Sequence, residues 1–182
     1  MSRRFTLAIT LSAITLLSAA VVWLTDGRAT SDATGLADTT PQGPGLERYV
    51  DPVGGFFFDY PAGFKVTVSD DGDSHTIFGD TPKGDTQFMV VSYPWAMTGP
   101  LTAEYIRGQS FADQLTSPIE PISLLPGISA FITGRTDTPL GATRDALFLH
   151  DGVAYQVSVV TAQRELFDGI LQTWRFTSPS TP

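Results

Sequence analysis

The chain has 182 residues with 11 basic and 19 acidic side chains, a formal net charge of −8 and no cysteine. Such a negative charge argues against nucleic acid as a partner, because association would begin against like-charge repulsion. The lack of cysteine excludes disulfides, thiol catalysis, iron–sulfur sites and a lipid-modified N-terminal cysteine.

Residues 1–25 predict a membrane segment. Two arginines precede an uncharged run that begins at Phe5 and ends at Leu24, long enough to cross a hydrocarbon core of about 30 Å. This charge order predicts a single-pass protein of the cell membrane, with a cytoplasmic N-terminus and the remainder on the periplasmic or extracellular side. The alternative is a signal peptide cleaved after residues 18–20, which would make the protein secreted. We favour the retained anchor because residues 21–24 continue the apolar run.

The remainder predicts one folded domain between two segments without a core. Residues 26–45 are rich in Thr, Ala, Gly, Asp and Pro and indicate a flexible linker. Residues 46–177, about 130 in all, are enough for one globular domain with a single core. Residues 178–182 are predicted to be a disordered tail.

The domain is predicted to be organised around a β-hairpin that turns at Asp151 and Gly152, two residues that tolerate the positive φ of a type I′ turn. This turn pairs His150 with Val153, Phe148 with Tyr155 and Ala146 with Val157. One face of this hairpin is then directed toward the core, and its opposite face carries Gln156 and Ser158. The core-facing residues are Phe148, Val153, Tyr155, Val157 and Val159.

An amphipathic helix follows the hairpin and should pack on it. Its apolar side is Leu166, Phe167, Ile170, Leu171 and Trp174, and its polar side is Arg164, Glu165, Asp168 and Gln172. A hairpin by itself is marginally stable in water, so helix and hairpin are expected to bury each other.

Four strands are predicted before a central helix, and one more between that helix and the hairpin. Residues 56–61 form a strand with Phe56, Phe58 and Tyr60 on one face, and Pro61 ends it. Residues 64–68 are expected to pair with residues 75–78. Residues 87–93 form a more central strand, and residues 128–134 form another. The residues before Phe56 are predicted to be an irregular segment that leads into this strand. Prolines are expected to prevent strand pairing in residues 117–126. Residues 135–143 are predicted to be a polar connection.

The central helix is expected to begin with Thr102 as its N-cap and to continue to Leu115. Its apolar face is Leu101, Tyr105, Gly108, Phe111, Ala112 and Leu115. A glycine inside that stripe suggests close approach to the sheet.

The element order predicts an α+β fold, an antiparallel sheet covered by helices. FDYPAGF after two glycines, the TAEYI helix and the ending DGVAYQVSVVT…ILQTWRF resemble the PsbP family, the extrinsic photosystem II proteins and their bacterial relatives. The resemblance covers nearly all of residues 49–176. It implies an α/β/α sandwich, export, and docking on a membrane protein complex rather than catalysis. No metal ligand of the photosystem members matches a position here.

The chemical motifs are weak, and neither a catalytic site, nor a cofactor, nor a metal is expected. Ser110 approximates a nucleophile elbow but falls inside a helical pattern. His75 and His150 border turns and are interpreted as solvated. Asp70, Asp71 and Asp73 indicate a hairpin turn, since the alternation and the glutamate of an EF-hand loop are missing, although a weak calcium site stays open.

A loop with Tyr93, Trp95 and Met97 is the candidate partner-binding site, because aromatics and Met are enriched in interface cores. The alternative is that Trp95 folds back over the sheet. The functional hypothesis is an anchored, non-enzymatic accessory domain that docks on a membrane protein complex, photosynthetic or respiratory. The rival is a small-ligand-binding domain or hydrolase, whose pocket between sheet and helices would include Tyr93, Trp95 and Tyr155.

Overall fold

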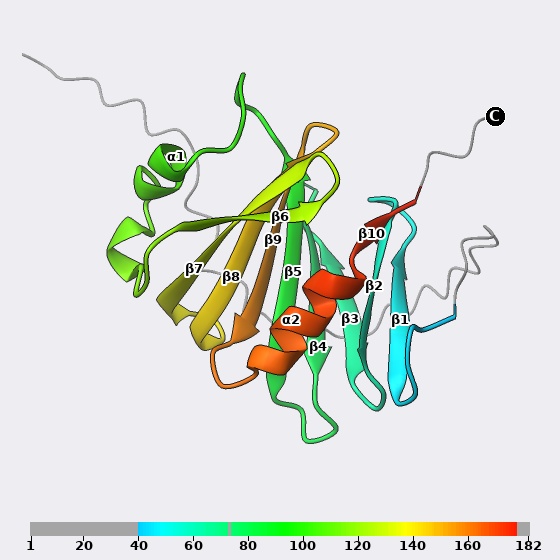
Figure 1. Cartoon of the computed structure of the whole chain (residues 1–182). Helices are drawn as coiled ribbons and strands as arrows, with labels where there is room; N and C mark the ends of the chain where they lie inside the picture. The colour runs from blue at the N-terminus through cyan, green and yellow to red at the C-terminus, as the bar shows by residue number, and fades with distance from the viewer. Residues whose placement is uncertain (1–39, 73, 178–182) are drawn as a thin grey trace, which may run out of the picture. The chain divides into compact units, whose positions relative to one another are not determined.

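The computed structural model describes residues 40–72 and 74–177, which form two antiparallel sheets and two short α-helices (Figure 1). The elements are β1 Leu46–Asp51, β2 Phe56–Pro61, β3 Lys65–Asp70, β4 His75–Asp80, β5 Thr86–Pro94, α1 Ala103–Arg107, the 3₁₀ turn η1 Ala112–Gln114, β6 Glu120–Leu125, β7 Ile128–Thr138, β8 Gly141–His150, β9 Val153–Val160, α2 Arg164–Thr173 and β10 Arg175–Phe176. The smaller sheet has the order β1-β2-β10 and the larger sheet the order β3-β4-β5-β9-β8-β7-β6. The predicted antiparallel sheet is confirmed, but β structure predominates and the two α-helices are short.

The predicted membrane segment and most of the predicted linker lie outside the described residues, as does the predicted tail. Within residues 40–72 and 74–177, none of the helices has the length and apolar character needed to span a membrane.

The central hairpin is confirmed. Strands β8 and β9 pair with His150 opposite Val153 and Phe148 opposite Tyr155, in the predicted register. Asp151 and Gly152 have φ of 48° and 75°, the left-handed values that a type I′ turn requires. Because residues Phe148 and Tyr155 are buried on the same face, this hairpin supplies the floor of the core.

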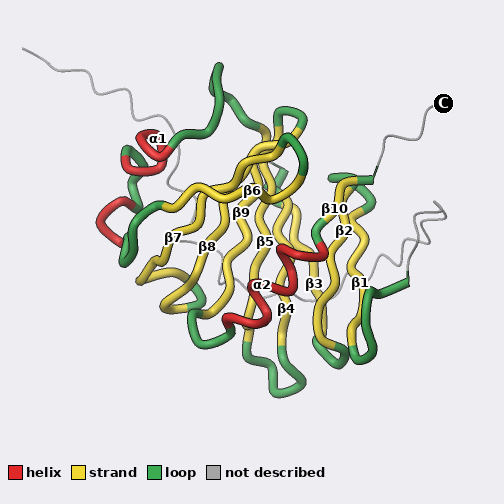
Figure 2. The backbone as a smooth tube through the Cα atoms, in the orientation of Figure 1, coloured by secondary structure: helices red, strands yellow, loops and turns green. Residues whose placement is uncertain are grey.

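The C-terminal helix is also confirmed, and it lies across one face of the larger sheet (Figure 2). Trp174 follows its last turn, is fully buried, and stacks on Phe56 with ring centroids 4.5 Å apart. Phe58 also stacks on Trp174, with ring centroids 5.5 Å apart. The side chain of Thr173 accepts a hydrogen bond of 2.9 Å from the backbone N–H of Asp59, which joins α2 to β2.

The early strands agree with their prediction, with one addition. Phe56, Phe58 and Tyr60 are all buried on one face of β2, and β3 pairs with β4 across the Asp70–His75 turn. The lead-in is itself a strand, since β1 pairs along the whole of β2. The apolar residues Leu46, Tyr49 and Val50 of this six-residue edge strand do not alternate with its polar residues, so the period-two signal of a strand is missing from the sequence.

Two predicted connections are wrong. Residues 120–125 form β6, which pairs with β7 despite Pro121, because an edge strand can leave the proline's missing N–H on its open side. The predicted polar connection of residues 135–143 is the paired end of β7 and β8, joined by a tight turn at residues 139–140. Its polar side chains resemble a loop in sequence, but Arg135 and Thr143 are buried.

The central helix is shorter than predicted. Thr102 is its N-cap as expected, and its side chain accepts a hydrogen bond of 3.1 Å from the N–H of Tyr105. Helix α1 ends at Gly108, which is a C-cap and not an interior residue in close approach to the sheet. Phe111, Ala112 and Leu115 belong to the turn after α1 and to η1. Their spacing is close to that of an α-helix, which is why they were predicted to continue it.

Candidate functional site

The loop that follows β5 carries the predicted partner-binding residues. Trp95 donates its backbone N–H to the carbonyl of Gly152 at 2.8 Å, so the loop is tied to the β8–β9 turn. Its indole Nε1 donates to the carbonyl of Gly99 at 3.0 Å, and its ring meets Tyr105 of α1 edge-on at 4.8 Å. Trp95 is thus half-buried against α1, whereas the side chain of Met97 is 54% exposed.

Tyr93 does not share a pocket with Tyr155. Tyr93 pairs with Ala154, so it lies on the opposite face of the sheet from the neighbouring Tyr155. Burial and the nearby Tyr105 raise the pKa of Tyr93, while Tyr155 stacks on Phe148 in the main core, where burial and then the charge of Asp51 raise its pKa to about 12. The aromatic pocket expected for a ligand-binding domain or hydrolase is therefore not formed by these residues.

His75 is not a solvated turn residue. Its Nε2 lies 2.6 Å from Asp51 of β1, its Nδ1 contacts Asp70 of β3, and its side chain is 13% exposed. Asp51 also accepts a hydrogen bond of 3.0 Å from the hydroxyl of Tyr49, and burial raises the pKa of that hydroxyl. His75 therefore links the smaller sheet to the β3–β4 hairpin.

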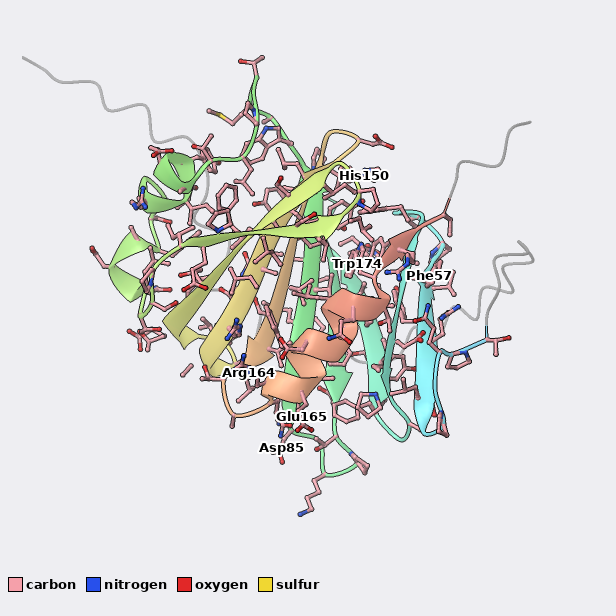
Figure 3. The ribbon with its side chains drawn as sticks, in the orientation of Figure 1. Phe57, Asp85, His150, Arg164, Glu165 and Trp174 are labelled. Carbon is pink, nitrogen blue, oxygen red and sulfur yellow. The ribbon has the colours of Figure 1, made fainter. Side chains whose placement is uncertain are left out.

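His150 likewise has a structural contact. Its ring stacks on Phe176 with centroids 3.7 Å apart, and its Nε2 lies 3.4 Å from Asp151. Figure 3 labels His150 near the β8–β9 turn. Beside it is a shallow cavity of about 230 Å³ that Tyr155 and Val53 also line. The prediction of a solvated histidine is thus wrong for His75, whereas the side chain of His150 is still 30% exposed.

The carboxylates of the β3–β4 turn make turn hydrogen bonds. Asp71 accepts from the backbone N–H of Ser74 at 2.7 Å, which closes the turn, and Asp70 contacts His75. Asp73 lies outside the described residues. Among the residues that the structure describes, no group of three His, Cys, Asp or Glu side chains is arranged to hold a metal ion.

Ser110 lies in the turn between α1 and η1 and is exposed. A nucleophile elbow requires a strand before the serine and a helix after it, so that the hydroxyl is held in a strained turn. Here a helix precedes Ser110, and the local structure does not provide that geometry.

A buried polar cluster was not found from the sequence. On the sheet face away from α2, Arg135 lies 3.3 Å from Asp145, donates to the side chain of Gln114 at 3.0 Å, and stacks over Phe111 at 4.2 Å. Burial raises the pKa of Asp145, although Arg135 and neighbouring hydroxyls act in the opposite direction. Ser158 points away from the aromatic core, as predicted, and pairs with Asp145. Its side chain is nevertheless buried, because this second face of the sheet is also covered. The only sequence feature that could have indicated this cluster was the alternation of polar residues in β7, β8 and β9.

Comparison with known proteins supports the fold. No protein-family model matches the chain, and no curated protein matches it. A match to a solved structure shows that the chain has a PsbP-like fold. The match is to the solution structure of cyanobacterial PsbP, CyanoP, from Synechocystis sp. PCC 6803, with a TM-score of 0.55 and 14% identity. It covers 81% of this chain and 98% of that one, so the resemblance seen in the sequence is confirmed for the fold.

Proposed function

We propose that this protein is a non-enzymatic accessory domain, exported and held at the membrane by residues 5–24, that docks on a membrane protein complex. The observation that carries the proposal is the PsbP-like fold with a tethered Trp95–Met97 loop at one end. A loop held by backbone hydrogen bonds presents its side chains with little further entropy to lose on binding. The shared fold supports the role only by analogy, so the loop is what the experiment must test.

The docking end combines apolar and acidic side chains. Met97 is 54% exposed and Val53, in the β1–β2 turn, is 80% exposed. The side chain of Asp151 is 84% exposed beside the same loop, and Asp71 is exposed in the β3–β4 turn. Exposed apolar and acidic side chains suit a partner surface that offers both apolar contacts and lysine or arginine side chains.

Purification of the tagged full chain from its native membrane in mild detergent tests the proposal. The wild type should bring down a membrane complex, and Met97→Asp should reduce its recovery by about tenfold, as expected for an interface residue worth more than 1 kcal/mol. Val68→Asp is the matched control, because Val68 is 45% exposed on β3, away from the loop. Migration of the wild type alone, or equal losses for the two variants, would contradict docking through this loop.

A further inference from the structure

We propose that Arg144 is the centre of a binding site for a small oxyanion, a phosphate or carboxylate group, at the end of the larger sheet. Arg144 lines a cavity of about 240 Å³ formed by β7, β8, the start of β6 and the segment before α2. The other residues along its lining include Thr116, Ser117, Thr133, Thr143 and Thr161.

The half-buried Arg144 makes no ion pair of the kind that neutralises the side chains of Arg48 and Arg135. Arg48 lies 2.7 Å from Asp59, and Arg135 lies 3.3 Å from Asp145. Within residues 40–72 and 74–177, no carboxylate lies within 4.0 Å of Arg144, and its buried Nε has no hydrogen-bond partner. A guanidinium that is partly removed from water without an acceptor is costly, and an oxyanion in the cavity would supply that acceptor.

The position of the guanidinium is fixed by packing. Its carbon lies 5.2 Å from the ring centroid of Phe167, which is fully buried in the first turn of α2. Gln163, the N-cap of α2, makes no side-chain capping bond, so the positive end of the helix dipole adds to the potential near Thr161. Figure 3 shows Arg164 and Glu165 at this end of α2, with Trp174 at the other.

Glu120 limits what can bind. Its carboxylate belongs to the cavity lining but makes no ion pair with Arg144. It therefore opposes an anion by repulsion, and its removal should strengthen binding. The cavity is larger than one phosphate ion, so a phosphate or carboxylate with a small substituent also fits.

This site is separate from the proposed docking loop. Thr143 pairs with Val160 at one end of the β8–β9 pair, whereas His150 pairs with Val153 at the other, next to the Gly152–Trp95 hydrogen bond. Loss of oxyanion binding should accordingly leave recovery of a membrane complex unchanged.

Calorimetric titration of the detergent-solubilised full chain with sodium phosphate, and separately with sodium succinate, tests the site at constant ionic strength. At least one titrant should bind, and the one that binds shows whether the group is phosphate or carboxylate. Arg144→Gln should weaken binding about tenfold, the loss expected for one charge-assisted hydrogen bond. Glu120→Gln should tighten it about threefold through removal of the opposing charge.

Arg164→Gln is the matched control, because Arg164 is a nearby arginine whose side chain is 73% exposed and paired with Asp168. It should change the affinity by less than about twofold, as expected for a screened surface charge. Thr161→Val gives a second test should Arg144→Gln lower the melting temperature. Binding of neither titrant, or equal affinities for wild type, Arg144→Gln and Thr161→Val, would overturn the proposal.

Discussion

The two faces of the larger sheet are covered in different ways. The face beneath α2 is an aromatic core, in which Trp174 and Phe56 stack and Phe148 stacks on Tyr155. The opposite face, beneath Phe111 and η1, holds the buried ion pair of Arg135 and Asp145. The first face is stabilised by removal of apolar surface from water, and the second depends on every polar group keeping a partner. Substitutions on each face should separate these two kinds of stability.

The largest effect is expected at the aromatic face. Trp174→Ala should lower the free energy of unfolding by about 3–5 kcal/mol, because it removes a fully buried ring that stacks on Phe56 and Phe58. Chemical denaturation of the full chain in detergent measures this loss. Asp168→Ala, on the exposed side of the same helix, is the control and should change stability by about 0.5 kcal/mol. Equal midpoints for both variants would show that α2 does not dock through Trp174.

At the polar face, Arg135→Met should cost about 3 kcal/mol, since it leaves Asp145 buried without its cation. Burial already raises the pKa of Asp145, so protonation of that carboxyl should keep the loss at the lower end of this class. The double variant Arg135→Met, Asp145→Leu should recover most of the stability in the same denaturation experiment. A double variant no more stable than the single one would mean that the pair is not the source of the loss.

A smaller effect, visible as pH dependence, should differ in sign between two buried carboxyls. Burial acts to raise the pKa of Asp59, but hydrogen bonds from Arg48 and the N–H of Gln42, with the charges of Arg48 and Arg175, hold it below its ordinary value of 3.8. Its stabilisation is therefore present above that value and is lost as the pH falls through the folded pKa.

For Asp145 the pKa is raised in the folded state, so its stabilisation is present below pH 3.8 and is lost as the pH rises through the folded pKa. Melting temperatures from acid to neutral pH measure both. Asp59→Asn should flatten the acid side of the wild-type profile, and Asp145→Asn should remove the decline on its neutral side. Identical profile shapes for the two variants would refute the assigned directions.

The smallest effect is expected at the cap of α1, which covers the polar face. Thr102→Ala should cost about 1 kcal/mol, because the N–H of Tyr105 loses the hydroxyl that accepts its hydrogen bond. Thr102→Ser keeps an acceptor and should be close to the wild type in thermal unfolding. Hydrogen–deuterium exchange of the α1 amides should be faster in the alanine variant alone. Unchanged protection in that variant would show that the cap does not stabilise this helix.

The sequence by itself determined the aromatic half of the protein. Local signals were strong there: the Asp151–Gly152 turn fixed the hairpin register, and the spacing from Leu166 to Trp174 fixed the buried side of α2. These features depend on residues close in sequence, where backbone geometry and periodicity are sufficient.

Only the tertiary structure decided the polar half and the candidate sites. Arg135 and Asp145 look like loop residues until β7 and β8 bring them together under Phe111, and His75 looks solvated until Asp51 arrives from β1. Likewise, the sequence around Arg144 does not show that its side chain lines a cavity, or that it makes no ion pair among the described residues. Whether a polar side chain is exposed or buried depends on segments far away in the chain, and short-range patterns carry no information about those contacts.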